Sequence, residues 1–143
     1  LVMSLSEKNS IDPDIWGPYF WKVIHFTSFG YPDNPTIVDK TAYKNFYFTL
    51  SKILPCDKCS VSSQENIDTI SLEKALESRE SLIRWSYNFH DKVNKKLNKT
   101  SPSFETFKYD FQNRDSNYIH IIITILLLLL LLYITMRYTS NTP

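Results

Sequence analysis

The clearest hydrophobic pattern in the chain lies between residues 78 and 98. Apolar residues recur there at spacings of three and four positions: Leu82, Trp85, Phe89, Val93 and Leu97. This spacing places them on one face of an α-helix. Ser78 stands before the pattern as an N-cap, and Asn98 follows it, where such a helix ends. The pattern predicts an amphipathic helix from Ser78 to about Leu97.

Prolines divide the preceding part of the chain into three further helices. Asp12-Pro13 is an N-cap followed by proline at the first helical position, and it opens a helix that runs to about Phe29. Asn34-Pro35 repeats this signal and opens a second helix to about Leu54. Pro55 separates that helix from a short third one. No segment alternates apolar and polar residues with a period of two, so no strand is predicted.

These elements predict an all-α fold: a four-helix bundle plus a short fifth helix, followed by a C-terminal transmembrane helix. Residues 1–11 form an N-terminal tail, residues 12–107 the folded domain and residues 108–118 a linker. Aromatic residues make up 15% of the chain. Many fall in the first and fourth predicted helices, where they fill the core or line a planar ligand.

A continuous apolar segment predicts the transmembrane helix at residues 119–136. It contains seven consecutive leucines, Leu126 to Leu132, and no charged residue. A helix of this length rises about 27 Å, close to the hydrocarbon core of about 30 Å. A buried core helix is the alternative, and the absence of a polar stripe argues against it. Residues 137–143 form a short C-terminal tail.

The position of this segment predicts how the protein meets the membrane. Seven residues follow it, and no apolar segment near the N-terminus has the form of a signal peptide. We therefore expect a single-pass, tail-anchored protein whose folded domain faces the cytosol. The flanking charges agree, because Lys99, Lys108 and Arg114 precede the span and Arg137 alone follows it.

The charge balance bears on one class of partner. The chain contains 15 acidic residues, and the part before the apolar segment contains as many basic ones. A domain without net charge has no excess of cations to neutralise phosphates. Nucleic acid is therefore not expected as a partner.

The only two cysteines form one motif, Cys56-Asp57-Lys58-Cys59, directly after Pro55. A helix that starts at the first cysteine stabilises its thiolate, and the spacing lets the second thiol resolve a mixed disulfide. The motif favours dithiol–disulfide exchange, with Cys56 and Cys59 as the catalytic pair. A zinc site is one alternative, although a closed site needs four ligands and the chain adds only three scattered histidines. The other alternative is that the spacing of the two cysteines is accidental.

Two pairs of residues at a spacing of four flank the cysteine motif. Trp21 and His25 share a face of the first predicted helix, and His90 and Asn94 share a face of the fourth. A single histidine is more often structural, but two such pairs around a CxxC favour a binding site. Four lysines form one basic face beyond them: Lys92, Lys95, Lys96 and Lys99. Such lysines usually complement a helix dipole, and the alternative is contact with a pyrophosphate.

Four segments follow one another in a specific order: Gly17 to His25 (GPYFWKVIH), Tyr31-Pro32, Leu54 to Cys59 (LPCDKC) and Trp85 to Lys99 (WSYNFHDKVNKKLNK). In this combination they resemble the Erv/ALR family of FAD-linked sulfhydryl oxidases. The resemblance covers residues 14–106, nearly the whole folded domain. The short chain with a single CxxC is most similar to the forms carried by large cytoplasmic DNA viruses, which implies a virion or host membrane.

The resemblance implies a homodimer of helical bundles, with the isoalloxazine ring of FAD beside the CxxC pair. Four residues would surround the adenine and ribose of FAD: Trp21, His25, His90 and Asn94. Five others would line the rest of the cofactor: Gly17, Tyr87, Val93, Lys96 and Lys99. Cys56, as the more exposed sulfur, would take the incoming thiol, and Cys59 would be the flavin-proximal sulfur.

The implied activity is a thiol oxidase that forms disulfide bonds in substrate proteins. Electrons would pass from dithiols through the CxxC disulfide and FAD to molecular oxygen, with release of hydrogen peroxide. There is no second cysteine pair to act as a shuttle, so the expected electron donor is a separate thioredoxin-like or CxxC dithiol protein. Two alternatives stay open: a tail-anchored structural or adaptor protein without a cofactor, and a flavin-free thiol–disulfide exchange protein.

The chain departs from the family pattern at several positions. Asp91 and Asn98 replace the family's asparagine and glycine beside the cofactor contacts, and Leu54 replaces the usual aromatic residue before the Pro-Cys pair. Tyr87 and Thr106 occupy the places of a structural disulfide that many members carry between the fourth and fifth helices. Both cysteines are absent together, so the domain is expected to lack this covalent link.

Overall fold

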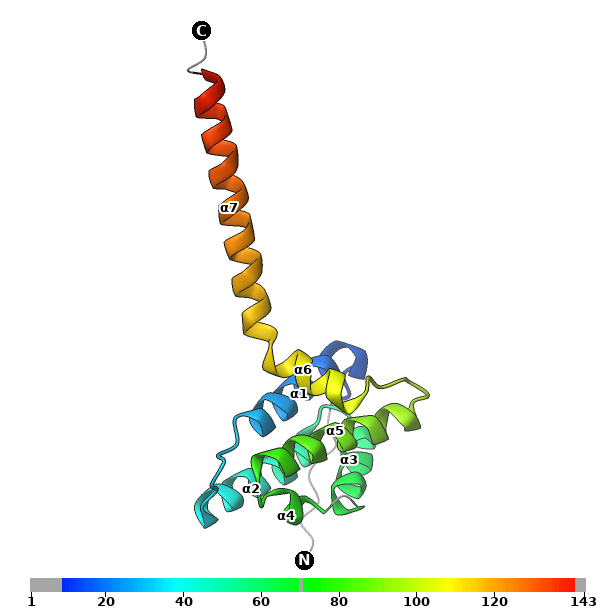
Figure 1. The fold of residues 1–143 in the computed structure, drawn as a ribbon. Coiled ribbons are helices and arrows are strands. Elements are labelled where there is room, and N and C mark those ends of the chain that lie inside the picture. The colour runs from blue at the N-terminus through cyan, green and yellow to red at the C-terminus, as the bar shows by residue number, and fades with distance from the viewer. Residues whose placement is uncertain (1–8, 70, 141–143) are drawn as a thin grey trace, which may run out of the picture. The chain divides into compact units, whose positions relative to one another are not determined.

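The part of the chain that the structure describes is entirely helical, which confirms the all-α prediction. The structure, a computed structural model, describes residues 9–69 and 71–140. Its helices in chain order are α1 (Pro13–Phe29), α2 (Ile37–Ile53), α3 (Asp57–Thr69), α4 (Leu72–Ala75), α5 (Arg79–Lys96), α6 (Phe104–Gln112) and α7 (Arg114–Ser140) (Figure 1). The chain divides into two compact units, Leu1–Phe107 and Lys108–Pro143. Most of the predicted N-terminal tail and the end of the predicted C-terminal tail lie outside the described residues.

Side-chain caps explain where the two helices of the predicted site begin. The Asp12 carboxylate accepts the backbone N–H of Asp14 at 3.0 Å and starts α1. The Ser78 hydroxyl accepts the N–H of Ser81 at 3.2 Å, and the Ser81 hydroxyl accepts the N–H of Ser78 at 3.1 Å, which starts α5. At the other end of α5, Asn98 has a φ of 54°, a left-handed conformation that asparagine tolerates. The predicted bounds of both helices are confirmed.

The start of α2 differs from the prediction. Asn34-Pro35 does not open this helix, which begins at Ile37. Thr36 is the N-cap, because its hydroxyl accepts the N–H of Asp39 at 3.2 Å and the Asp39 carboxylate accepts the N–H of Thr36 at 2.8 Å. This reciprocal capping box satisfies two backbone donors that a proline-led start would leave to solvent.

The core lies where α1, α2, α3 and α4 meet α5. Helix α1 packs against α5, α2 packs against α3, and α3 and α4 each contact α5. The core consists of apolar and aromatic side chains, among them Ile24, Tyr31, Tyr47, Ile67, Leu72, Leu76, Leu82, Trp85 and Phe89. The one-turn helix α4 was not predicted, and its Leu72 is only 3% exposed. The stripe predicted on α5 is buried at Leu82, Trp85 and Phe89, while Leu97 at its end is 57% exposed.

Residues 108–118, predicted as a linker, are helical except at Asn113, because α6 continues to Gln112 and α7 begins at Arg114. The short fifth helix predicted within residues 100–118 corresponds to α6. In the second unit, the segment Ile119–Arg137 of α7 is long and apolar enough to cross a membrane. Its large apolar side chains are exposed along its length. This segment is a candidate membrane anchor.

Candidate functional site

The two cysteines form a disulfide at the N-terminus of α3, as the motif predicts. Cys56 precedes the first residue of the helix, and the Cα atoms of Cys56 and Cys59 lie 5.2 Å apart. The carbonyl of Cys56 accepts the N–H of Ser60 at 2.9 Å, so Cys56 holds the N-cap position. The backbone N–H of Cys59 donates to the Cys56 sulfur at 3.1 Å. A negative charge that develops on this sulfur would meet a backbone donor and the positive end of a helix dipole.

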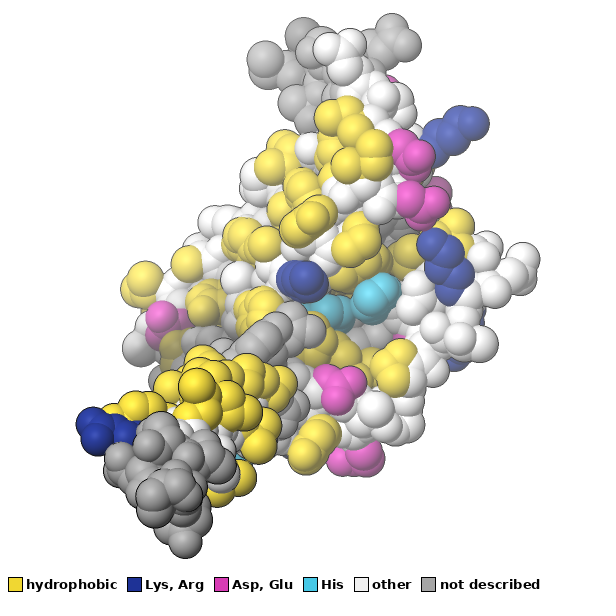
Figure 2. Space-filling view, turned by 90° about the horizontal axis from the view of Figure 1, so that it is seen from above, with side chains coloured by type: hydrophobic (Ala, Val, Ile, Leu, Met, Phe, Trp, Pro, Cys, Tyr) yellow, Lys and Arg dark blue, Asp and Glu magenta, His cyan; other side chains and the backbone are white. Residues whose placement is uncertain are grey.

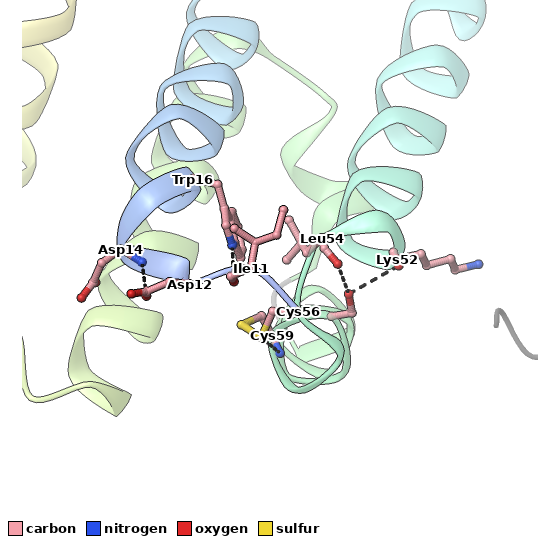
Figure 3. The surroundings of a disulfide bond; sticks show 9 residues. Ile11, Asp12, Asp14, Trp16, Lys52, Leu54, Cys56 and Cys59 are labelled. Atoms are coloured by element: carbon pink, nitrogen blue, oxygen red, sulfur yellow. Dashed lines mark hydrogen bonds between the residues drawn. A yellow bond between two sulfur atoms is a disulfide. The ribbon is translucent and has the colours of Figure 1, made fainter. Parts of the chain in front are cut away.

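Hydrogen bonds to the backbone hold the turn between α2 and α3. The Ser60 hydroxyl faces the carbonyl of Leu54 at 3.3 Å and that of Lys52 at 3.4 Å (Figure 3). Leu54 is 8% exposed and joins the buried side of the turn. The two cysteines therefore follow a turn that hydrogen bonds hold in place.

The segment before α1 lies against this turn. The N–H of Ile11 donates to the carbonyl of Pro55 at 2.9 Å, and the carbonyl of Ile11 accepts the indole N–H of Trp16 at 2.9 Å (Figure 3). Cys56 is 8% exposed, whereas Cys59 is half-buried. The prediction that Cys56 is the more exposed sulfur is therefore wrong. Its place at the bend, between Ile11 and the end of α2, is the physical reason.

The fold brings the predicted tryptophan and both predicted histidines into one cluster. The rings of Trp21 and His90 are stacked, with centroids 3.9 Å apart and planes 9° apart. The Nε2 of His25 lies 2.9 Å from the Nδ1 of His90, and this hydrogen bond joins α1 to α5. We expected these rings to surround a ligand, yet Trp21 and His90 are in direct contact. A planar ligand would therefore extend this stack rather than separate the two rings.

Burial keeps both histidines of the cluster neutral near pH 7. Desolvation, with a smaller effect of His90, lowers the pKa of His25 to about 3. Desolvation also lowers the pKa of His90 to about 4, although the neighbouring Asp91 carboxylate opposes this shift. The pair therefore offers uncharged aromatic surface with one proton on each ring.

Two buried serines complete this cluster, and the sequence did not single them out. The Oγ of Ser86 lies 3.2 Å from the Nδ1 of His25 and 3.0 Å from the Oγ of Ser28. Both serines are 0% exposed. Ser28 comes three residues after His25 on α1, and Ser86 comes four before His90 on α5, so helical spacing from each histidine was the signal available.

The remaining predicted cofactor residues lie around the C-terminal end of α5 and the start of α1. The Tyr87 hydroxyl donates to the carbonyl of Pro102 at 2.8 Å, and the Asn94 amide donates to the Ser101 hydroxyl at 3.0 Å. These two side chains thus hold the loop before α6. Two of the other predicted cofactor residues make polar contacts: Lys96 reaches the Ser62 hydroxyl at 3.2 Å, and Lys99 reaches the Asp14 carboxylate at 3.5 Å. Val93 packs on the core, and Gly17 is half-buried.

Helix α6 contacts the cluster through aromatic rings. Phe107 packs edge-on against His25 with centroids 4.7 Å apart, and it lies 5.3 Å from the ring of Tyr87. Phe104 lies 5.4 Å from Tyr87, and the guanidinium of Arg84 stands 3.8 Å above the Phe104 ring. Non-covalent contacts therefore attach α6 to α5 and to the cluster.

The surface at this cluster fits a flavin dinucleotide. Trp21 and His90 present flat uncharged rings suited to an adenine. A Cβ added at Gly17 would meet nothing within 4 Å, so the surface there is open, and the positively charged Lys96 and Lys99 are exposed. Figure 2 shows histidine side chains beside a Lys or Arg side chain and apolar ones. No group of three or more potential metal ligands occurs among the residues described by the structure.

The sequence of this chain is similar to those of two viral proteins. A protein of Invertebrate iridescent virus 3 is 34% identical over 97 residues, which are 68% of this chain and 66% of that protein. A protein of Acanthamoeba polyphaga mimivirus is 36% identical over 85 residues, 59% of each chain. The names of both place them among the FAD-linked sulfhydryl oxidases. The matched region thus spans less than two thirds of the length of these two relatives.

A solved structure and a family model agree with these relatives. The crystal structure of the FAD binding domain of Erv1 from Saccharomyces cerevisiae superposes with a TM-score of 0.67 at 31% identity. It covers 72% of this chain and 96% of that domain. The model of the Erv1/Alr family matches residues 18–114, which include the disulfide turn and both predicted histidines. The chain therefore belongs to the Erv1/Alr family.

Proposed function

We propose that this protein is an FAD-dependent thiol oxidase that forms disulfide bonds in substrate proteins. The observation that carries the proposal is the Cys56–Cys59 disulfide at the N-terminus of α3, in a chain of the Erv1/Alr family. The names of the relatives, FAD-linked sulfhydryl oxidases, support both the activity and the cofactor.

The disulfide accepts two electrons by thiol exchange. A substrate thiolate attacks one sulfur of the Cys56–Cys59 bond, which forms a mixed disulfide and releases the other sulfur as a thiolate. A second substrate thiolate attacks the substrate sulfur of this mixed disulfide, so a substrate disulfide leaves and both cysteines are reduced. The N–H of Cys59 stabilises the charge on Cys56 during these steps. Bound FAD supplies the two-electron chemistry that restores the disulfide and reduces oxygen to hydrogen peroxide.

The cofactor contacts come from α1 and from the C-terminal half of α5. Trp21, His25 and His90 form the aromatic surface for the adenine. Lys96 and Lys99 would hold the pyrophosphate, because their charges would offset those of the phosphates. Four further residues complete the lining: Gly17, Tyr87, Val93 and Asn94. Tyr87 and Asn94 act there by holding the loop that leads to α6.

The electron donor is a separate thioredoxin-like or CxxC dithiol protein. These 143 residues contain only the one cysteine pair. Cys59 is half-buried, so a partner can reach this disulfide from the surface. The incoming thiol is proposed to bond to Cys56 although Cys56 is the less exposed of the two residues, and mixed-disulfide trapping with each single cysteine variant tests this order.

Two exposed apolar faces support a homodimer. On α1 they are Ile15, Tyr19, Val23 and Phe26; on α2 they are Ile37, Val38 and Ile53, beside a shallow groove lined by Phe46 and Leu50. Faces of this kind are costly in water and are typical of subunit contacts. Val23→Glu should convert a dimer to a monomer in light scattering, whereas Asn88→Glu, at an exposed position of α5, should not.

The charges around α7 favour a cytosolic orientation of the folded domain. Lys108 and Arg114 precede the apolar segment and Arg137 follows it, which matches the excess of positive charge on the cytosolic side. An added glycosylation acceptor after Pro143 should be modified in an endoplasmic-reticulum membrane. The native acceptor Asn98-Lys99-Thr100, exposed in the structure, should stay unmodified. Glycan on Asn98 would place the domain in the lumen.

One purification tests the proposed function against its rivals. The full chain in detergent should be yellow, show the visible absorption of a flavin, and consume oxygen with dithiothreitol as the substrate. A colourless protein that still exchanges disulfides would be a flavin-free exchange protein. A colourless protein without exchange activity would be an adaptor, and the proposal would be abandoned.

A further inference from the structure

A chain of side-chain hydrogen bonds runs through the interface between α1 and α5. It links Ser28 to Ser86 at 3.0 Å, Ser86 to the Nδ1 of His25 at 3.2 Å, and the Nε2 of His25 to the Nδ1 of His90 at 2.9 Å. Ser28 and Ser86 are 0% exposed and His25 is 2% exposed, so water does not reach the inner part of this chain. His90 is half-buried and forms its outer end.

Counting protons decides which nitrogen of His25 carries its hydrogen. Four buried contacts around the serines each need one proton: His25 Nδ1 to Ser86, Ser86 to Ser28, Ser28 to the carbonyl of His25 at 2.7 Å, and Ser86 to the carbonyl of Ile83 at 2.9 Å. The two hydroxyls supply two protons. With its hydrogen on Nδ1, His25 adds a third and satisfies one more contact. The Nδ1–H form is therefore favoured, because it makes one more hydrogen bond within this buried cluster.

The state of His25 fixes the state of His90. With its proton on Nδ1, His25 has a bare Nε2 that can only accept a hydrogen bond, so His90 must donate from its Nδ1. Because burial keeps His90 neutral near pH 7, its Nε2 then carries no proton. This nitrogen points away from His25 across the ring, and it makes no hydrogen bond to the residues that the structure describes.

We infer that Ser86 and His25 lock His90 into the form that presents a bare Nε2, so this part of the site accepts a hydrogen bond from a ligand N–H or O–H. The inference rests on the proposed function, because FAD is the ligand concerned. Ser86 and His25 are positioning residues here, while the Nε2 of His90 is the group that meets the ligand. FAD offers two such donors close to its adenine end, the exocyclic amino group of the base and the ribose hydroxyls.

Two serine variants separate this lock from ordinary packing. Ser86→Ala removes the acceptor of the His25 Nδ1–H, and a buried donor is harder to leave unsatisfied than a buried acceptor. The His25 proton should therefore move to Nε2, and the proton of His90 should follow to its own Nε2. Ser28→Ala removes a hydroxyl from the same interface but leaves Ser86 as the acceptor, so both histidines should keep the wild-type form. It is the matched control.

Nitrogen NMR of histidine-labelled full chain in detergent reads the proton positions with or without cofactor. We expect a bare His90 Nε2 in the wild type and in Ser28→Ala, and a protonated one in Ser86→Ala. A protonated Nε2 in the wild type, or the same pattern in both variants, would overturn the inference. If Ser86→Ala does not fold, the wild-type spectrum alone decides. The result is independent of flavin loading, so a failed oxidase assignment would show separately as a colourless protein.

The affinity for FAD provides a second test of the inference. In reconstitution of the flavin-depleted full chain, we expect about tenfold weaker FAD binding for Ser86→Ala and little change for Ser28→Ala. A dinucleotide with unsubstituted purine in place of adenine lacks the amino donor, and a dinucleotide with a deoxyribose on the adenine side lacks a hydroxyl donor. About tenfold weaker wild-type binding of either analogue would support the inference and identify the donor. Equal binding of all three would overturn it.

Discussion

The disulfide turn and the histidine cluster lie in one domain but are held by different kinds of contact. The turn is fixed by the backbone: the carbonyls of Cys56 and Pro55 both accept backbone N–H groups, and a backbone N–H caps the Cys56 sulfur. The cluster is fixed by side chains from two helices, through the stack of Trp21 on His90 and the contact of His25 with Ser86. A short motif can encode the first, whereas the second needs a correct pairing of α1 with α5.

This difference predicts how each region responds to substitution. Replacing a side chain in the turn should remove chemistry and leave the fold, because the backbone bonds remain. Replacing a side chain in the cluster should loosen both the cofactor and the bundle, because the same rings serve as ligand surface and as core.

The largest effect should come from the cysteines. Cys56→Ser and Cys59→Ser should each lower oxygen consumption with dithiothreitol to background, because the exchange steps need both sulfurs. Flavin content and melting temperature should stay close to those of the wild type. Lys58→Ala, between the two sulfurs, is the matched control and should retain activity. Near-normal turnover in either serine variant would show that the pair is not the redox centre.

The next largest effect should come from Trp21→Ala. Its ring stacks on His90 and packs edge-on against Phe89 at 5.3 Å, so its loss removes ligand surface and core contact together. We expect a partly flavin-free protein and a melting temperature lower by roughly 10 °C. Tyr109→Ala removes a ring that is 61% exposed and should change neither quantity. Flavin content and melting equal to the wild type in Trp21→Ala would remove this ring from the site.

Local sequence signals predicted the turn and the helix bounds well. Asp12-Pro13 and Ser78 mark helix starts through caps that depend on a few neighbouring residues, and the structure has those caps. Pro55 separates α2 from α3 for the same local reason. The failure at Asn34-Pro35 has a local cause too, because the stronger capping box of Thr36 and Asp39 lies next to it.

Contacts between helices were harder to predict. The spacing of Trp21 and His25 indicated a shared face but not that Trp21 would stack directly on His90. The spacing of Ser86 from His90 indicates a shared helix face, but its role depends on which side chain of α1 faces it. The low exposure of Cys56 has the same kind of cause, because the segment at Ile11, which bonds to the neighbouring Pro55, comes from a distant part of the chain.

A smaller effect should follow from pH. The pKa values of His25 and His90 are lowered to about 3 and about 4 by burial, so the unfolded chain binds more protons than the folded one once pH falls below about 6.5. Stability from this pair is complete above pH 6.5 and declines toward pH 4, by about 1–2 kcal/mol between pH 6.5 and 5.5. Urea unfolding across this interval measures it, and His90→Gln should reduce the slope by about half. Stability that is unchanged or higher at pH 5.5 would contradict the buried neutral pair.

The smallest effect should come from the attachment of α6, which tests whether side-chain contacts alone hold a helix where the disulfide is absent. Tyr87→Phe keeps the ring contacts with Phe104 and Phe107 but loses the hydrogen bond to Pro102, which is worth about 1 kcal/mol or less at this exposed position. We expect slightly faster hydrogen exchange at the amide of Phe107, which donates to Ser103 at 2.9 Å.

Tyr87→Ala also removes the ring that contacts Phe104 and Phe107. It should accelerate hydrogen exchange at Phe107 several times more than Tyr87→Phe, while exchange in α2 stays unchanged. Tris(2-carboxyethyl)phosphine should reduce the Cys56–Cys59 bond without changing exchange in α6, because no sulfur takes part in that attachment. If Tyr87→Phe and Tyr87→Ala had equal effects, the hydrogen bond would be the main contact. The aromatic contacts between α5 and α6 would then contribute little to the attachment of α6.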